Sequence, residues 1–390
     1  MTTRAVTLSY PPEGFGAPKN RHGHARSGSL GLPAGTEVFS ADNHISLSED
    51  IFYENFPASM KDQAPRVIRQ DGAWTLAIDG KGFLPREFTA VLTQYDPCAG
   101  AATNDPEARA RELESDGVQR ELAFPNALLG LMGWPDKKVR ELCFRIYNQH
   151  IAELQERSNG RFYAVGIANW WDGDGARTTL AEMKDLGLTT FWMPLKPGAD
   201  DNGKQIDYSS PAMDPVWDAI EESGLPVAHH IGEAPLASPC RDNGVLVGMV
   251  HNAAPFREMF GRYVFGILDR HPGLHIGWFE GGINWVPAAL QDAEHLYASA
   301  QHMADHRIEH EVEHYWRRHM YASFMVDQLG LEMIDRIGVD QVMWSSDYPH
   351  NESTFGYSEQ SLADVVNAVG PEAAVKIVST NVLSFLGLDR

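Results

Sequence analysis

Short apolar runs alternate with longer amphipathic segments along almost the whole chain, and their number limits the folds that the chain can adopt. Eight runs have the β-branched and aromatic composition of strands. They cover residues 37–42, 119–125, 162–169, 189–195, 225–231, 274–280, 320–325 and 341–346. Most are apolar at nearly every position, as are strands that are covered on both faces. The pattern predicts a parallel sheet.

Helix-like segments separate these runs, and several end at a glycine shortly before the next run. The clearest cover residues 105–117, 136–157, 175–187, 211–224 and 255–271. Eight strands, each followed by helical material, predict an α/β fold of the (β/α)8 TIM barrel type. A doubly wound open sheet is the alternative, but no G-x-G-x-x-G or Walker pattern follows a strand.

Two segments depart from the repeating pattern. Residues 1–36 are rich in Gly, Pro and Ser and are expected to form an extended arm, followed by a single barrel domain over residues 37–390. The connection from the first strand to the second is longer than one crossover requires. Residues 50–100, with a hairpin expected within 72–83, are therefore interpreted as an insertion that caps the barrel mouth.

The charge and cysteine content narrow the range of partners. Acidic residues outnumber basic ones 53 to 32, and the net charge of -21 disfavours nucleic acid and anionic membrane surfaces. No stretch reaches the roughly 18 apolar residues that a bilayer requires, and no secretory leader is evident. Three widely spaced cysteines suggest no disulfide framework. We expect a cytoplasmic protein that binds a small molecule and forms a homodimer or higher oligomer.

Ionisable residues gather at the ends of the predicted strands, where (β/α)8 barrels carry their chemistry. These residues are Asp42, His44, His229, His230, Glu233, Glu280, Asp347 and His350. Any one of them alone is explained as a turn residue, a helix cap or a core histidine. Asp and His residues that converge from the first, fifth and eighth strands instead provide nitrogen and oxygen ligands for a divalent metal ion. Zinc is the first choice, with manganese and iron as alternatives.

The two adjacent histidines of the fifth strand cannot both face the barrel interior. Neighbouring strand residues point to opposite faces, and this parity alone does not choose between His229 and His230. The histidine that is not a ligand is expected in the core or in a hydrogen bond that orients a ligand. His350, three residues after Asp347, is expected to support the ligands in the same way.

Five segments, in this order, resemble the amidohydrolase superfamily, specifically its branch of aminocarboxymuconate-semialdehyde decarboxylase and related aromatic-acid decarboxylases and hydrolases. They read SADNHISLSEDIFYENFP, LPVAHHIGE, RHPGLHIGWFEGGINWVP, YWRRHMYASF and VMWSSDYPHNES. The resemblance covers roughly residues 37–390 and implies a (β/α)8 barrel with one divalent metal ion. It implies Asp42, His44, His230 and Asp347 as the ligands, which selects His230 over His229.

Two positions depart from the pattern of that branch. Glu280 stands where well-studied decarboxylases have a histidine at the end of the sixth strand, and Ser46 stands where many members have a second histidine. A two-metal site is therefore not expected, and decarboxylation is not the first choice of reaction. The HPGL segment also matches, and its His271 is expected to be structural, on the far side of the barrel.

The leading interpretation is a metal-dependent hydrolase, in which the metal lowers the pKa of a bound water toward about 7. Asp347 is expected to take the proton of this water and pass it to the leaving group. Glu280 is either a second acid or base or a carboxylate that fixes its neighbours. The alternatives are a metal-dependent non-oxidative decarboxylase of an aromatic or muconate-type acid, and a non-catalytic barrel that has lost its metal.

Residues that follow the third, fourth and fifth strands are candidates for contacts with a small aromatic or carboxylated substrate. Trp170 and Trp171 provide either an aromatic wall or core packing. Lys196 and Arg241 are the cations best placed for a substrate carboxylate, although each can also be a solvated loop charge. His251 lies on the long loop after the fifth strand and is expected to reach the pocket.

Overall fold

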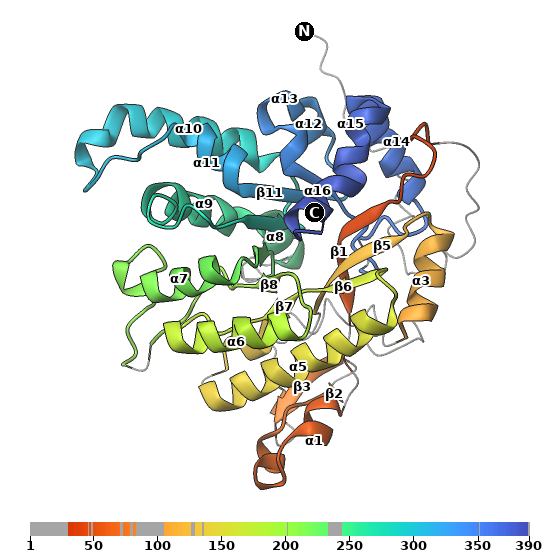
Figure 1. Cartoon of the computed structure of the whole chain (residues 1–390), viewed down its shortest axis with the longest axis vertical. Coiled ribbons are helices and arrows are strands. Elements are labelled where there is room, and N and C mark those ends of the chain that lie inside the picture. Colours follow the sequence, from red (N-terminus) through yellow and green to blue (C-terminus); the bar gives the residue numbers. More distant parts are fainter. Residues whose placement is uncertain are drawn as a thin grey trace.

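The computed structural model describes residues 30–45, 47, 50–70, 73–78, 81–82, 105–125, 129–134, 136–200, 202–232, 244–350 and 352–388. In this part of the chain, parallel strands form the centre of the molecule and helices surround them (Figure 1). The central strands are β1 (Phe39–Ile45), β5 (Arg120–Pro125), β6 (Phe162–Ala164), β7 (Gly166–Ile167), β8 (Phe191–Trp192), β9 (Val227–His230), β10 (Ile276–Phe279), β11 (Met320–Phe324) and β12 (Val342–Trp344). Every predicted run overlaps at least one of them.

The third strand of the barrel is interrupted at Val165, which divides it into β6 and β7. The sheet order is β1-β5-β6 on one side of this break and β7-β8-β9-β10-β11-β12 on the other. The Val165 amide still donates to the Ala123 carbonyl at 3.0 Å, and the Gly166 amide donates to the Thr190 carbonyl at 3.1 Å. The interrupted strand therefore faces β5 before the break and β8 after it.

The first and last strands meet through the segment that follows β12. The Asp347 amide donates to the Asp42 carbonyl at 2.8 Å, and the His44 amide donates to the Tyr348 carbonyl at 2.7 Å. These two hydrogen bonds join β12 to β1 without a continuous ladder between them. The predicted α/β fold of (β/α)8 type is confirmed, with this seam and the break at Val165 as its irregular joins in the described residues.

β1 extends further than the sequence indicated. It continues to Ile45, so that Asp42 and His44 lie inside the strand and not after it. Its register with β5 shifts between Ser40 and Asn43. Such a bulge places an extra residue on one strand and changes the direction of the side chains next to it.

The surrounding helices cover the outside of the barrel. The main ones are α3 (Pro106–Ser115), α5 (Lys137–Arg157), α6 (Gly173–Asp185), α7 (Asp214–Ser223), α9 (Ala254–Gly266), α10 (Trp285–Ala300), α11 (Val312–His319) and α14 (Ser358–Val369). α5, α6, α7, α9 and α10 lie one above another along one side in Figure 1. All five helices predicted from sequence are present.

Local sequence explains where these helices begin and which face they bury. Asp105, Asp136 and Asp172 precede α3, α5 and α6, and each accepts hydrogen bonds from amides of the first turn. α7 ends at Gly224, whose φ of 70° suits glycine. In α5 the buried apolar residues recur every three or four positions, as in a helix packed on one face.

The remaining short elements connect these parts. They are α4 (Leu129–Met132), η5 (Pro211–Met213), α8 (Gly244–Val250), η6 (Gln301–Met303), α12 (Gln328–Glu332), α13 (Ile334–Ile337), η7 (Val339–Gln341), α15 (Pro371–Val375), η8 (Lys376–Thr380) and α16 (Asn381–Phe385). Phe385 of α16 packs against Phe279 and Tyr321, with ring centroids 5.5 and 5.6 Å apart. α16 therefore packs against β10 and β11.

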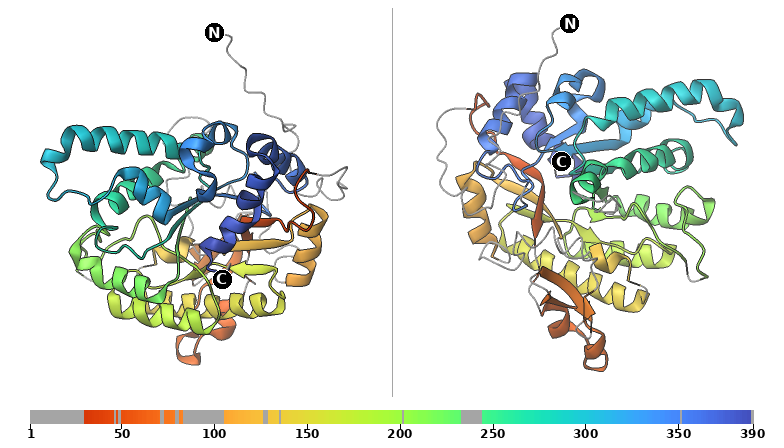
Figure 2. Two further views of the ribbon diagram at one scale, coloured as in Figure 1. Left: turned by 45° about the horizontal axis from the view of Figure 1, so that its top comes forward. Right: turned by 180° about the vertical axis from the view of Figure 1, so that it is seen from behind.

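The insertion after β1 consists of helical turns and a small antiparallel sheet. Its elements are α1 (Ile51–Asn55), η3 (Ala58–Gln63), β2 (Arg66–Gln70), β3 (Ala73–Ile78) and β4 (Lys81–Gly82). β3 pairs with β4, which confirms the hairpin expected within 72–83, and β2 adds a third strand. Figure 2 shows this unit projecting at the end of the molecule beyond α5. The rest of the expected insertion and most of the expected arm lie outside the described residues.

No helix in the described ranges combines the length and the apolar character needed to cross a membrane.

Candidate metal centre

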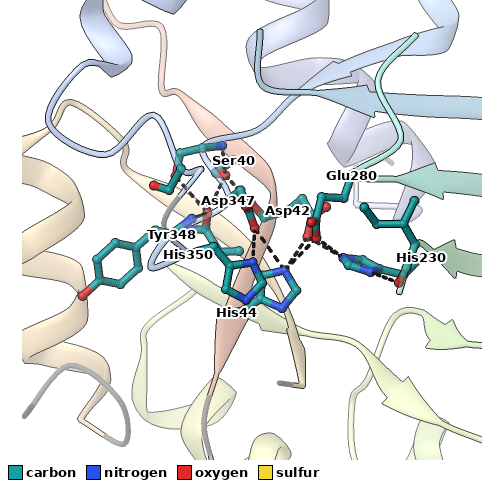
Figure 3. Close-up of polar contacts among 12 residues, drawn as sticks. Ser40, Asp42, His44, His230, Glu280, Asp347, Tyr348 and His350 are labelled. Carbon is teal, nitrogen blue, oxygen red and sulfur yellow. Dashed lines mark hydrogen bonds and ion pairs between the residues drawn. The ribbon is translucent and has the colours of Figure 1, made fainter. Parts of the chain in front are cut away.

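Five ionisable side chains meet at the carboxyl ends of the barrel strands (Figure 3). Asp42 and His44 come from β1, His230 ends β9, and Glu280 directly follows β10. Asp347 follows β12 by three residues. All five are buried or nearly so. Residues far apart in the sequence therefore form one compact polar cluster inside an apolar barrel.

The Nε2 atoms of His44 and His230 lie close to the carboxylates of this cluster. His44 Nε2 lies 3.1 Å from Asp347 Oδ1, 3.3 Å from Glu280 Oε2 and 3.6 Å from Asp42 Oδ1. His230 Nε2 lies 2.9 Å from Glu280 Oε2 and 3.4 Å from Asp42 Oδ1. Two donor atoms that share one ion at about 2.1 Å are themselves about 3.0 to 3.5 Å apart. The separations in the cluster therefore fit a common divalent ion.

The hydrogen-bonding state of these atoms supports the same fit. Both carboxylate oxygens of Asp42, Nε2 of His230 and Oε2 of Glu280 are buried and make no hydrogen bond within the described residues. Buried polar atoms without partners are costly and rare in native proteins. A bound cation would satisfy all of them at once, so the residues present fit a metal ion.

The tautomer of His230 is set by its own backbone. Its Nδ1 lies 2.8 Å from the Ile231 carbonyl oxygen, which can only accept a hydrogen bond. Nδ1 therefore carries the proton, and Nε2 presents its lone pair to the cluster. This is the arrangement that a metal-binding imidazole requires.

Two of the carboxylates are carried on left-handed backbone. Glu280 has φ of 64° and Asp347 has φ of 58°, and among the described residues only Asn159 joins them as a non-glycine residue with positive φ. Such a conformation costs of the order of 1 to 3 kcal/mol and persists where surrounding contacts enforce it. Here the enforcing contacts include the Glu280 amide, which donates to Ser323 Oγ at 3.0 Å, and the Asp347 amide on Asp42.

Electrostatics within the cluster shift its pKa values in opposite directions. Burial opposes the charge of Glu280, but His230 and His44 outweigh it and hold the pKa of Glu280 well below its ordinary value. Burial likewise disfavours charged His230, yet Asp42 and Glu280 raise its pKa well above the usual range. For Asp42, burial wins and raises the pKa. The carboxylates thus attract a cation, and a divalent ion would displace the proton from His230.

His350 extends the cluster beside Asp347. Its Nδ1 lies 2.9 Å from Asp347 Oδ1, and its ring stacks on His44 with centroids 3.8 Å apart. Burial lowers the pKa of His350, but the Asp347 carboxylate outweighs this effect and raises the pKa to about 10. The Asp347–His350 pair therefore holds a proton next to the cluster.

A buried amide, Asn43, supports the cluster from behind, and sequence reasoning missed it. Its Oδ1 accepts hydrogen bonds from Ser40 Oγ, Ser346 Oγ and the Tyr348 amide, each at 2.9 Å. Its Nδ2 donates to Glu121 Oε2 at 2.7 Å. Asn43 therefore ties β1 to both neighbours of Asp347. Its position between Asp42 and His44 in the sequence could have indicated this role.

His229 does not support a ligand, and that expectation is corrected by its position. Its Nδ1 donates to the Met193 carbonyl at 2.7 Å, and its Nε2 accepts from Tyr263 Oη at 2.8 Å. Its ring stacks on Trp278, with centroids 5.3 Å apart. Since neighbouring strand residues face opposite sides, His229 faces the outer helices while His230 faces the cluster.

The two tryptophans expected at the mouth pack on a buried arginine of α5. The Arg140 guanidinium lies 3.8 Å from the ring centroid of Trp171 and 4.9 Å from that of Trp170. Trp170 Nε1 donates to the Pro197 carbonyl at 3.0 Å. These contacts correspond to the core-packing interpretation, and neither ring contacts the five clustered residues.

The other expected substrate contacts are exposed or lie outside the described residues. Lys196 and His251 are exposed. Arg241, Glu233 and Ser46 are not among the described residues.

Three aromatic residues that sequence reasoning missed surround His230. Its ring centroid lies 4.5 Å from that of Phe124 and 5.3 Å from that of Trp192, and Phe124 also contacts Phe279 at 4.9 Å. Trp192 Nε1 is buried and has no hydrogen-bond partner in the described part of the chain. Strand pairing could have indicated two of them, because Phe124 lies beside His44 and Phe279 lies beside His230 in neighbouring strands.

Three comparisons place the chain among known proteins. A family model described as amidohydrolase matches residues 93–388. No curated protein matches the chain. Solved structures that resemble it include an amidohydrolase from Mycobacterium avium subsp. paratuberculosis K-10, with 18% identity, 91% of this chain and 100% of that chain covered, and a TM-score of 0.70.

Two 5-carboxyvanillate decarboxylases also share the fold. The one from Sphingomonas paucimobilis is 20% identical, with 90% of this chain and 99% of that chain covered and a TM-score of 0.64. The one from Novosphingobium aromaticivorans, complexed with manganese and 4-hydroxy-3-methoxy-5-nitrobenzoic acid, is 15% identical, with coverages of 93% and 100% and a TM-score of 0.67. At these identities the structures show a common fold. Since the family model spans most of the sequence, the chain belongs to the amidohydrolase family.

Proposed function

We propose that the chain is a metal-dependent non-oxidative decarboxylase of a small aromatic carboxylic acid. The observation that carries this proposal is the aromatic surface of Phe124 and Trp192 directly against His230. A flat ring that lies on this surface would present its substituents to the cluster. The two similar structures that are 5-carboxyvanillate decarboxylases favour this reaction over the hydrolysis that the sequence suggested first.

The metal would be held by Asp42, His44, His230 and Glu280, whose donor atoms lie within 4.8 Å of one another. Asp347, the fourth ligand expected from the sequence, lies 3.1 Å from His44 and belongs to an overlapping group with Glu280 and His350. When bound, such an ion would supply a Lewis acid for the substrate carboxylate. Three carboxylates and two imidazoles form an oxygen-rich set that suits manganese as well as zinc. The manganese in one similar structure makes Mn²⁺ the first ion to test.

The chain's own part in the reaction is to hold the ring and deliver a proton. Loss of carbon dioxide leaves the bonding electron pair on the ring carbon, which must then receive a proton. We assign this delivery to Asp347, with His350 as the group that keeps the pair protonated at neutral pH. Glu280 is a poorer donor, because its pKa is held well below its ordinary value by the histidines.

Hydrolysis is the second candidate, because three carboxylates around one ion can take a proton from a bound water. A barrel without a metal is the third candidate. The unpartnered buried atoms of Asp42, His230 and Glu280 count against it, since burying polar atoms without a partner is costly.

A direct assay separates these candidates. The full chain, loaded with Mn²⁺ or Zn²⁺, is incubated with a panel of hydroxylated benzoates and, separately, with esters, amides and lactones of similar size. The proposal expects carbon dioxide release and a product that has lost one carboxyl group. Asp347→Asn should abolish turnover, while His251→Ala, an exposed histidine, should retain it. Turnover of the hydrolytic panel alone would establish the second candidate instead.

A further inference from the structure

A second group of ionisable residues lies far from the cluster, on α7 and on the loop that leads into β10. Asp214, Asp218 and Glu221 follow one another at intervals of four and three residues, which places them on one face of α7. This face is turned toward His271, just before β10. The loop lies at the amino end of β10, whereas Glu280 follows its carboxyl end. The two groups therefore lie at opposite ends of the strand.

His271 is buried, and its two ring nitrogens have different surroundings. Nε2 lies 3.2 Å from Asp214 Oδ1 in a hydrogen bond. Nδ1 is buried and makes no hydrogen bond within the described residues, although it is directed at two carboxylates. It lies 3.4 Å from Asp218 Oδ1 and 3.7 Å from Glu221 Oε2. An imidazole that donates through one nitrogen to a carboxylate presents the lone pair of the other, as metal-binding histidines do.

The lone pair of His271 Nδ1 faces oxygen atoms of Asp218 and Glu221 that neighbouring charged side chains in the described residues do not occupy. Asp214 is committed to Arg270, whose Nε and Nη2 lie 3.1 and 2.9 Å from its Oδ1. Glu221 Oε1 accepts a hydrogen bond from the Gly273 amide at 2.5 Å, which fixes this carboxylate and leaves Oε2 directed at His271. Asp218 is half exposed, so that solvent reaches the space between the three groups.

We propose that His271 Nδ1, Asp218 and Glu221 form a second divalent metal site, of the nitrogen and oxygen type that binds zinc, with water completing the coordination. The three donor atoms lie within 4.8 Å of one another, as ligands of one ion must. Asp214 orients the histidine from behind. A bound ion would tie α7 to the loop before β10 and would stabilise the barrel without touching the cluster at its other end.

Metal counting on the full chain tests this site. Protein stripped with a chelator is dialysed against zinc, and bound metal is measured by elemental analysis. We expect about two zinc ions per chain, one for each site. The double variant Asp218→Asn with Glu221→Gln should lose one ion and should also lose part of the zinc-induced rise in Tm. His44→Ala should lose the other ion and keep this one.

A matched control removes two carboxylates with the same spacing from another helix. Glu182→Gln with Asp185→Asn removes two carboxylates three residues apart on α6, where no described histidine joins them. This variant should keep both ions. His271→Gln should resemble the double variant, and circular dichroism shows that each variant is folded. The proposal is overturned if the unaltered chain saturates at one zinc ion, or if the Asp218 and Glu221 variant still binds two.

Discussion

The Asp347 amide donates a hydrogen bond to the Asp42 carbonyl oxygen at 2.8 Å, so the backbone couples two carboxylates that face the same cluster. Asp42 lies in the first strand of the barrel and Asp347 follows the last. The seam that completes the barrel is thus also the part of the fold that sets the spacing of its ionisable groups. Changes at the seam should affect the stability of the fold and the cluster together.

Asn43→Ala tests this coupling. The substitution removes one buried amide that serves Ser346, Tyr348 and Glu121, and the groups left behind lose their partners. We expect a loss of roughly 2 to 4 kcal/mol in the free energy of unfolding, together with a lower metal content. Urea unfolding measures the first effect. Asn55→Ala, at an exposed position of α1, should change stability by less than about 1 kcal/mol. Equal unfolding midpoints for the two variants would contradict the role given to Asn43.

A buried ion pair next to Asn43 provides a second test. Arg109 Nε lies 2.5 Å from Glu121 Oε1, and Nη2 lies 2.8 Å from Oε2, with both side chains buried. Glu121→Gln removes one charge of this buried pair and should cost about 3 to 5 kcal/mol. Glu182→Gln breaks the exposed pair with Arg145 and should cost about 1 kcal/mol or less. If urea unfolding gives similar losses of stability for the two variants, the Arg109–Glu121 pair is not desolvated as described.

His230→Ala should empty the candidate metal centre. The tautomer of His230 is fixed by a backbone carbonyl, and loss of His230 removes a donor from the cluster. We expect zinc-loaded protein to lose the ion of this centre and to keep about one ion per chain at the second site. His251→Ala is the matched control, because His251 is exposed. An unchanged metal count in the first variant would remove His230 from the ligand set.

Trp192→Phe tests the proposed substrate surface. The change keeps an aromatic ring beside His230 but removes the buried, unpartnered Nε1 donor. If this donor serves the bound substrate, kcat/KM should fall about tenfold, the cost of one hydrogen bond in a buried site. Trp278 also has a buried, unpartnered Nε1 but contacts His229 on the outer face, so Trp278→Phe should leave kcat/KM nearly unchanged. Equal effects would indicate a purely structural role.

His229 should make the fold sensitive to mild acid. Burial lowers its pKa to about 4, against 6.5 for an unhindered histidine, so the unfolded chain binds the proton first. Stability is then highest above about pH 6.5 and falls as the pH drops toward 4. Between about pH 7.5 and pH 5 this group alone should cost about 2 kcal/mol. Urea unfolding of the metal-free chain at both pH values should show a smaller pH effect in His229→Gln, and an equal effect would contradict this account.

The barrel was predictable because its strands are short, apolar and regularly spaced. Each predicted run overlaps an observed strand, since a buried parallel strand requires apolar residues at almost every position. The limits of β1 were less visible. Its bulge between Ser40 and Asn43 lets the strand continue through Asp42 and His44, residues that in sequence resemble a strand terminus.

Residues on strands were located better than residues on loops. The five clustered side chains lie on strands or directly after them, where the fold dictates their direction. Trp170 and Lys196 follow β7 and β8 by three and four residues, but Trp170 packs on Arg140 and Lys196 is exposed, and His251 lies 21 residues after β9. Trp192 was overlooked because an aromatic residue inside an apolar strand looks the same whether it lines a core or a binding surface. The positive φ of Glu280 had no sequence signal, since glutamate seldom adopts it.

The seam between the first and last strands also dictates when the cluster can exist during synthesis. Asn43 and Tyr348 contact each other across 305 positions of the chain. At about 5 to 20 residues per second, a ribosome needs about 15 to 60 s to make the intervening segment. During that time the β1 residues are already exposed to the cell, but the opposite side of the cluster has not been made. A nascent chain therefore has only some of the metal-binding residues. Only the completed barrel can select among the metal ions of the cell.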